Sequence, residues 1–331
     1  MASAVSNPHD KFFKEILSDI NNAKSFFQEY LPQDILKAVN LDTLIIQKDS
    51  FIEKDFKEFF SDMLYTVLIG DKKSYIYLLF EHKSKFDKRT PLQLLQYMIK
   101  IWQLHIKQKG FPLPVVIPLV LYHGEDKWSL KTDFGQLFDK NTKQFKAYIP
   151  DFNYILYDLS QYTDDQIKGE VFLKAALLLF KYSSTKDILK KLPDIFSLLR
   201  SIAASKTGLA SLEAFFRYIY YSSDLEMEKL KKIASESLNK SREEAIMTLA
   251  QRLINEGMQK GRQEGRQEGM QKGMQKGMRQ TIIDILESRL NSVDKLILDS
   301  LAEIQDFDKL RAIAKRAALI NSREELTMLL N

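Results

Sequence analysis

Two acidic residues and a lysine in the first half of the chain have the types and spacing needed for phosphodiester chemistry. Asp62 stands directly before an apolar, β-forming run, residues 63–69. Glu81 follows a second such run, residues 74–80, and Lys83 comes two residues later. The runs are separated by Gly-Asp-Lys-Lys, a composition typical of a tight hairpin turn. The pattern predicts an antiparallel hairpin with polar groups at its open end.

A hairpin turning about Asp71 and Lys72 pairs residues whose numbers sum to 143, and this register places Asp62 directly opposite Glu81. Opposed residues have Cβ atoms ~5 Å apart, so two carboxylates there repel each other and call for a cation between them. Strand alternation returns Lys83 to the face of Glu81, whereas His82 points the other way. The register therefore predicts that Asp62, Glu81 and Lys83 converge.

The chemistry that this group suggests is hydrolysis of a phosphodiester bond. Two hard carboxylate donors suit Mg²⁺ or Mn²⁺, ions that keep bound water and contact substrate phosphates. Such an ion lowers the pKa of a bound water, and a lysine beside it can orient or deprotonate that water. A chance pattern stays open at this point, since Glu125 and Lys127 form a second Glu-x-Lys in a glycine-containing loop.

The elements expected around this group alternate between helix and strand, which predicts an α/β core. The helix expected after the hairpin has a well-marked start, where Thr90 can cap, Pro91 suits the first helical position and Gln93 completes a capping box. The expected segments besides the hairpin are, in order, helix 8–30, strand 41–47, helix 90–109, strand 115–122 and strand 153–158.

Length and composition fit a globular protein of two units. The chain has 331 residues, 45% of them hydrophobic and 28% charged, and a net charge of +5. It has no cysteine, which excludes disulfides, thiol nucleophiles and zinc ribbons and suits a cytoplasmic location. Its longest apolar stretch, residues 111–122, is short and carries three prolines, so we expect no membrane span.

The sequence changes character along its length and predicts four parts. Residues 1–160 hold the α/β core, and residues 161–256 show helical spacing and are expected to pack on it as an extension. Residues 257–280 form a tetrapeptide repeat, expected to be a helix or a linker. Residues 281–331 follow as a C-terminal helical unit for oligomerisation or regulation.

Within the repeat, glycine recurs every four residues from Gly257 to Gly277, so the glycines form a drifting stripe on an α-helix. Six glycines cost about 6 kcal/mol of helix propensity relative to alanine, which suggests a compensating contact. We expect a polar helix that pairs with another copy and makes a homo-oligomer through residues 257–331. The alternatives are a flexible basic linker that contacts DNA phosphates and a repeat expansion tolerated in an exposed connector.

The hairpin residues, taken with three further segments, resemble a known family. Asp62 and Leu-Leu-Phe-Glu-His-Lys at 78–83 are similar to the metal-binding core of the PD-(D/E)XK nuclease superfamily. His-Asp-Lys-Phe-Phe-Lys at 9–14, Gln93 with Tyr97, and Leu-Val-Leu-Tyr-His-Gly at 119–124 are similar to its recombination-promoting nuclease, or putative transposase, family. Ser61 stands where the superfamily name has proline.

This resemblance implies a Mg²⁺-dependent DNA endonuclease, with Mn²⁺ as an alternative ion. The implied fold is a restriction-endonuclease-like three-layer α/β core with a mixed central sheet, followed by an α-helical C-terminal region. Asp62 and Glu81 would be metal ligands and catalytic residues, with Lys83 as the catalytic lysine that positions water. Gln93 and Tyr97 would border the site and contact DNA, and Asp10 would be an accessory acid.

Simpler interpretations of these residues remain open. Gln93 is explained equally well by the capping box, and Tyr97 by packing on its helix. His123 and His82 are typical of core or turn histidines. Two other functions also stay in view: a transposase, and a non-catalytic DNA-binding or assembly protein on a decayed nuclease fold. The resemblance further suggests limited sequence specificity and a link to recombination or mobile elements.

Overall fold

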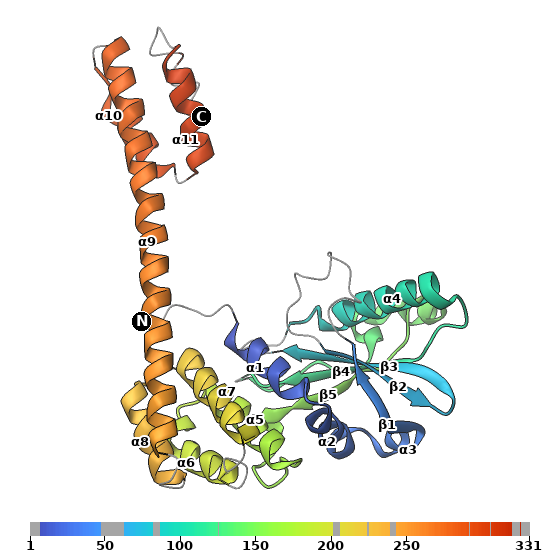
Figure 1. Cartoon of the computed structure of the whole chain (residues 1–331). Helices are drawn as coiled ribbons and strands as arrows, with labels where there is room; N and C mark the ends of the chain where they lie inside the picture. Colours follow the sequence, from blue (N-terminus) through green and yellow to red (C-terminus); the bar gives the residue numbers. More distant parts are fainter. Residues whose placement is uncertain are drawn as a thin grey trace. The chain divides into compact units, whose positions relative to one another are not determined.

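A computed structural model describes the chain at residues 7–47, 63–81, 87–124, 126–200, 206–223, 225–238, 243–290, 292–304, 306–319 and 325. The chain divides into two compact units between Ile254 and Asn255 (Figure 1). In the first unit, the helices are α1 (Pro8–Leu17), α2 (Ile20–Tyr30), α3 (Gln33–Ala38), α4 (Thr90–Lys109), α5 (Val171–Ser183), α6 (Ile188–Leu199), α7 (Lys206–Ser222) and α8 (Met227–Ser237). Helix α9 (Glu243–Leu290) begins there and continues into the second unit, which also holds α10 (Lys295–Glu303) and α11 (Phe307–Ala317).

A five-stranded mixed sheet forms the centre of the first unit, with its strands in sequence order. They are β1 (Val39–Ile46), β2 (Met63–Ile69), β3 (Lys72–Glu81), β4 (Val116–Tyr122) and β5 (Ile155–Asp158). The first three are antiparallel, whereas β3, β4 and β5 run parallel. Parallel neighbours need a crossover connection, and α4 supplies it between β3 and β4. The expected order of helix, three strands, helix and two strands is confirmed, as is the α/β class.

Strand alternation on β3 builds two cores, one on each face of the sheet. Ile76, Leu78 and Phe80 pack into the larger core with α1, α2 and α5–α8. Tyr77 and Leu79 face the other way, into a smaller core with α4 and the segment around residues 128–156. Helices thus cover both faces of the sheet (Figure 1).

The hairpin register differs from the prediction. Met63 pairs with Leu78, whereas a pairing of Asp62 with Glu81 requires Met63 to face Phe80. The chain reverses over Gly70 and Asp71, and Gly70 takes the left-handed conformation, with φ of 58°, that glycine adopts at little cost. The predicted register is wrong by two residues, a shift that leaves each paired side chain on its expected face.

Two further local predictions are corrected at helix ends. The expected helix 8–30 is two helices, because the Asp19 side chain accepts hydrogen bonds from the Asn21 and Asn22 backbone amides and starts a new helix. At α4 the bounds are as expected, but the capping box is wrong. Thr90 already lies inside the helix, and its buried hydroxyl has no hydrogen-bond partner among the described residues.

In the second unit, the end of α9 packs with α10 and α11 around its own apolar core, which includes Ile282, Leu286, Leu301 and Leu310. The glycine repeat is helical and lies within α9. Among the described helices, none has both the length and the apolar character that crossing a bilayer requires.

Candidate active site

Glu81 is the last residue of β3 and is buried, with 5% of its surface exposed. Its strand lies between β2 and β4 in the centre of the sheet, so the burial of β3 also buries this carboxylate. In the parallel register Glu81 lies beside Tyr122, and the backbone amide of His123 donates to the Glu81 carbonyl at 3.3 Å. The carboxyl ends of parallel strands are where open α/β sheets place their binding sites.

Asp10 brings a second carboxylate to this end of the sheet. It lies in the first turn of α1 and is also 5% exposed. The Asn7 side chain caps the helix by accepting from the Asp10 amide at 3.2 Å, and its own amide group donates to the Asp10 carboxylate. Burial raises the pKa of Asp10 to about 6; Lys14 and Asn7 lower it, and the Glu81 carboxylate raises it further. Burial is the main cause of the raised pKa, and the Glu81 charge adds to it.

Two histidines lie beside these acids: His9 precedes Asp10 in the chain, and His123 follows the β4 residue that pairs with Glu81. The ring centroids of His9 and His123 are 5.1 Å apart, and His123 is stacked on Phe80 at 4.9 Å. His9 Nδ1 is hydrogen-bonded to the Tyr218 hydroxyl at 2.9 Å. His123 is buried, as the core interpretation of this residue expects. His9 and Tyr218 were not among the predicted site residues, since 209 positions separate them and no local pattern connects them.

Of the other predicted site residues, Asp62 and Lys83 lie outside the described residues, as does His82. Tyr97 is in the core of α4, where its ring stacks on Tyr77 with centroids 4.8 Å apart. Tyr77 precedes Glu81 by four residues, a distance of ~13 Å along the strand. Gln93 is half-buried one turn earlier on α4. The structure thus brings Asp10 to Glu81 and leaves Tyr97 within the packing of α4 on the sheet.

The donor chemistry of this site fits a divalent ion in part. Asp10 and Glu81 supply hard carboxylate oxygens, the donors that Mg²⁺ and Mn²⁺ prefer, and a cation would offset both the burial and the Glu81 charge that raise the Asp10 pKa. Within the described part of the chain, no three histidine, aspartate or glutamate side chains are grouped to hold a metal. Asp62, the other predicted metal ligand, lies outside the described residues and directly precedes β2 in the chain.

Comparison with known proteins places these residues in a family. Residues 7–210 match the family described as "Putative transposase, YhgA-like". The chain belongs to this family. Asp10, Glu81 and both histidines lie inside the matched range, as do Asp62 and Lys83. No solved structure matches the chain.

Several relatives from Escherichia coli match most of the chain. The inactive recombination-promoting nuclease-like protein RpnE of strain K12 is 31% identical over 78% of this chain and 85% of its own length. Recombination-promoting nuclease RpnD of O157:H7 is 29% identical over 76% of this chain and 95% of its own length. Recombination-promoting nuclease RpnA of K12 is 29% identical over 77% of this chain and 86% of its own length. These names support the resemblance to the recombination-promoting nucleases.

Proposed function

We propose that this chain is a metal-dependent DNA endonuclease that hydrolyses phosphodiester bonds with limited sequence specificity. The observation that carries the proposal is the pair of buried carboxylates, Asp10 and Glu81, at the carboxyl end of β3. Burying two mutually repelling carboxylates is unfavourable for folding, and a cation-binding function explains why both are there. The names of RpnD and RpnA support DNA as the substrate.

In this proposal Asp62 and Glu81 hold Mg²⁺, or Mn²⁺, with Asp10 as an accessory acid. The bound ion would lower the pKa of a coordinated water and offset charge on the phosphate. Asp10, with a pKa of about 6, is about nine-tenths ionised at pH 7, so its carboxylate could donate a lone pair to the ion or accept a proton from water. Lys83 would orient or deprotonate the attacking water, or stabilise negative charge on the phosphate.

The remaining features extend the proposal to the fold and the setting. A mixed sheet covered by helices on both faces supports a restriction-endonuclease-like core. Gln93 would contact DNA from the exposed side of α4, whereas the burial of Tyr97 favours a role in holding that helix. We propose a cytoplasmic enzyme linked to recombination or mobile elements, as the family description and the relatives' names suggest.

Plasmid cleavage tests the nuclease directly. Full-length protein is incubated with supercoiled plasmid in Mg²⁺, in Mn²⁺ and in EDTA, alongside Glu81→Gln, Asp62→Ala and Lys83→Ala. We expect nicking or linearisation that needs the metal and falls by at least about 100-fold in each variant. Asp10→Asn is assayed as well, to test the accessory acid. Its control is Glu15→Gln, because Glu15 lies on the same helix but its carboxylate interacts with Arg217 and Glu213. Cleavage that persists in EDTA, or in all three site variants, contradicts the proposal.

A second candidate is a non-catalytic DNA-binding or assembly protein on a decayed nuclease fold. The observation that favours it is the similarity to RpnE, whose name describes that relative as inactive. This function predicts metal-independent DNA binding with no cleavage in either ion, and binding that Glu81→Gln leaves unchanged. A transposase, as the family description suggests, would instead join DNA ends, so strand-transfer products in the same plasmid assay identify it.

We also propose that residues 257–331 make a homo-oligomer. Apart from the backbone of α9 itself and the adjacent residues, a Cβ added at Gly261, Gly265, Gly269, Gly273 or Gly277 would meet no atom of the described residues within 4 Å. Contacts within the described chain therefore do not explain the glycine stripe, and a second copy of α9 could use the open backbone. Light scattering on the full chain gives the mass directly, and a monomer at all accessible concentrations contradicts this proposal.

A further inference from the structure

The first turn of α1, which carries Asp10, is hydrogen-bonded to α7, a helix much later in the sequence of the first unit. His9 precedes Asp10, and its Nδ1 atom lies 2.9 Å from the hydroxyl of Tyr218 on α7. The bond joins residues 209 positions apart. The following inference rests on the proposed function, because it concerns how the Asp10 carboxylate is held near Glu81.

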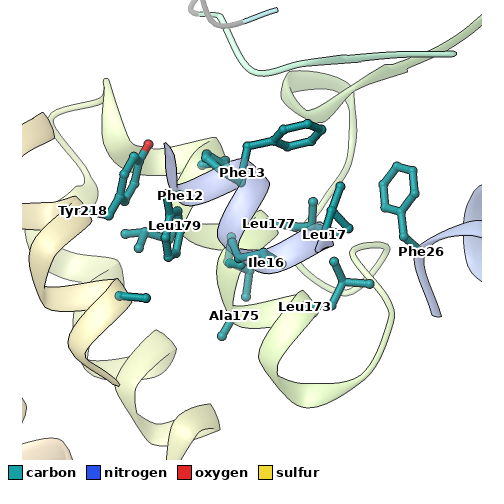
Figure 2. Close-up of a cluster of buried hydrophobic side chains, with 14 of the residues drawn as sticks. Phe12, Phe13, Ile16, Leu17, Phe26, Leu173, Ala175, Leu177, Leu179 and Tyr218 are labelled. Atoms are coloured by element: carbon teal, nitrogen blue, oxygen red, sulfur yellow. The ribbon is translucent and has the colours of Figure 1, made fainter. Parts of the chain in front are cut away.

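Tyr218 is a rigid anchor for this bond. It is 2% exposed, and its ring stacks on Phe12 with centroids 4.4 Å apart and an interplanar angle of 13°. Phe180 of α5 lies against the same ring at 5.5 Å, and Phe12 also contacts Phe180 and Phe215. Figure 2 shows Phe12 and Tyr218 side by side within this apolar cluster. The packing of α5 and α7 therefore holds the hydroxyl in place, where it is also hydrogen-bonded to Ser183 and Ser222.

A series of touching rings continues from Tyr218 to the end of β3. The rings of Tyr218 and His9 are 5.4 Å apart, those of His9 and His123 are 5.1 Å apart, and His123 stacks on Phe80. His9 is the residue before Asp10, and Phe80 is the residue before Glu81. The residues that precede the two acids, His9 and Phe80, are therefore members of one ring series with His123 packed between them, and this packing constrains how far apart the two acids lie.

The start of α1 needs such support. The first amides of a helix have no intrahelical partner, so the first turn opens more easily than the rest. Opening here would also hydrate the Asp10 carboxylate, which is 5% exposed in the closed turn, and move it away from the end of β3. Hydration favours displacement of Asp10, and the hydrogen bond between His9 and Tyr218 opposes it.

We propose that Tyr218 and His9 are positioning residues for the nuclease site and hold Asp10 at the distance from Glu81 at which both can serve one divalent ion. On this basis α7, although it lies far along the sequence, helps to position a carboxylate of the site. The effect is on the placement of a carboxylate, so it changes turnover and metal affinity more than DNA affinity.

The test compares Tyr218→Phe, His9→Ala, His9→Asn and the double variant Tyr218→Phe/His9→Ala in the full chain. The control is Tyr182→Phe, which removes a hydroxyl bonded to Asp164 at 2.6 Å elsewhere among the same helices. Readouts are kcat and KM for plasmid cleavage, Mn²⁺ affinity by electron paramagnetic resonance, and thermal unfolding to confirm the fold. Tyr218→Phe keeps the stacked ring, so it isolates the hydroxyl from the packing.

We expect Tyr218→Phe and His9→Ala each to lower kcat and Mn²⁺ affinity by about fivefold or more, with KM changed by less than about twofold. The double variant should lower kcat and Mn²⁺ affinity no further than His9→Ala does alone, because without the His9 ring the Tyr218 hydroxyl has no bond to the first turn of α1 left to lose. His9→Asn, which keeps an amide near the Nδ1 position, should recover activity alone but not when combined with Tyr218→Phe. Tyr182→Phe should leave both constants unchanged.

The outcomes separate this inference from the proposed function. If the wild type cleaves, Glu81→Gln does not, and Tyr218→Phe matches Tyr182→Phe in kcat and in Mn²⁺ affinity, the positioning role is overturned and the nuclease stands. If the wild type fails to cleave but binds Mn²⁺, the nuclease is overturned. The positioning role is then decided by whether Tyr218→Phe weakens that binding. A wild type that neither cleaves nor binds Mn²⁺ overturns both.

Discussion

Replacing Asp10 with asparagine should stabilise the protein while it impairs the proposed site. Burial raises the pKa of Asp10 from 3.8 to about 6, so the folded state holds this proton more tightly than the unfolded state does. A raised carboxylate pKa means that the charged form of Asp10 lowers the free energy of unfolding. This loss is fully present above the folded pKa and disappears as the pH falls towards 3.8. The shift corresponds to about 3 kcal/mol at pH 7, to about half of that at pH 5 and to less than about 1 kcal/mol at pH 4.

Urea unfolding of Asp10→Asn and wild type across this pH range measures that cost. The variant keeps a polar group for Asn7, so we expect a gain of up to about 3 kcal/mol at pH 7 that shrinks steadily as the pH falls to 4. Asp34→Asn is the matched control, because Asp34 is an acid in the first turn of α3 but is exposed. A gain that does not depend on pH, or a loss of stability at pH 7, refutes the reasoning.

The same unfolding comparison can be repeated with Mg²⁺ or Mn²⁺ added. An ion that binds only the folded state stabilises it in proportion to the logarithm of its concentration above Kd. If the Asp10 and Glu81 carboxylates share an ion, Mg²⁺ or Mn²⁺ should stabilise the wild type more than Asp10→Asn, so the gain of the variant at pH 7 narrows as metal is added. An equal response of both proteins shows that Asp10 does not contribute to metal binding.

Two predictions concern glycines. Alanine at Gly265, Gly269 and Gly273 together should stabilise α9 by about 3 kcal/mol, because alanine has the higher helix propensity. If close backbone approach holds two copies together, the same variant should have a lower mass by light scattering. An unchanged mass contradicts the pairing of two copies. Gly70→Ala should lower the free energy of unfolding by about 1–2 kcal/mol, because the φ of 58° strains an alanine there although its Cβ would have open space. Gly169→Ala should lower it more, because the added Cβ would lie 2.7 Å from a Leu173 side-chain carbon. Equal losses of unfolding free energy at these two positions contradict the packing argument.

The sequence predicts the elements better than their ends and pairings. Helix α4 has its expected bounds because Pro91 and a long amphipathic pattern mark it without ambiguity. The hairpin register was missed because Gly-Asp-Lys-Lys allows the two-residue turn at more than one place. A shift of two residues leaves the apolar alternation unchanged, so side-chain pattern cannot detect it. The break before α2 was missed because apolar residues continue across Asp19, whose capping role depends on backbone geometry.

The site shows the same division between local and long-range information. Glu81 could be identified from the strand pattern and the resemblance, and Asp10 from the resemblance alone. The contact of His9 with Tyr218 could not, because nothing near either residue indicates the other. Tyr97 had two interpretations that sequence could not separate, and its stacking on Tyr77 gives it a place in the core between α4 and the sheet.

The helices after β5 belong to the same folding unit as the sheet. The larger core crosses the expected boundary at residue 160 without a break, since Phe12 and Phe13 of α1 lie in one cluster with Phe180 of α5 and Phe215 of α7. The matched family range, 7–210, likewise runs past the sheet and into α7. The sheet positions Glu81, but α1 positions Asp10, and α1 is held largely by α5 and α7. A carboxylate pair formed in this way needs both parts of the fold, so the helical region is a structural requirement of the proposed site.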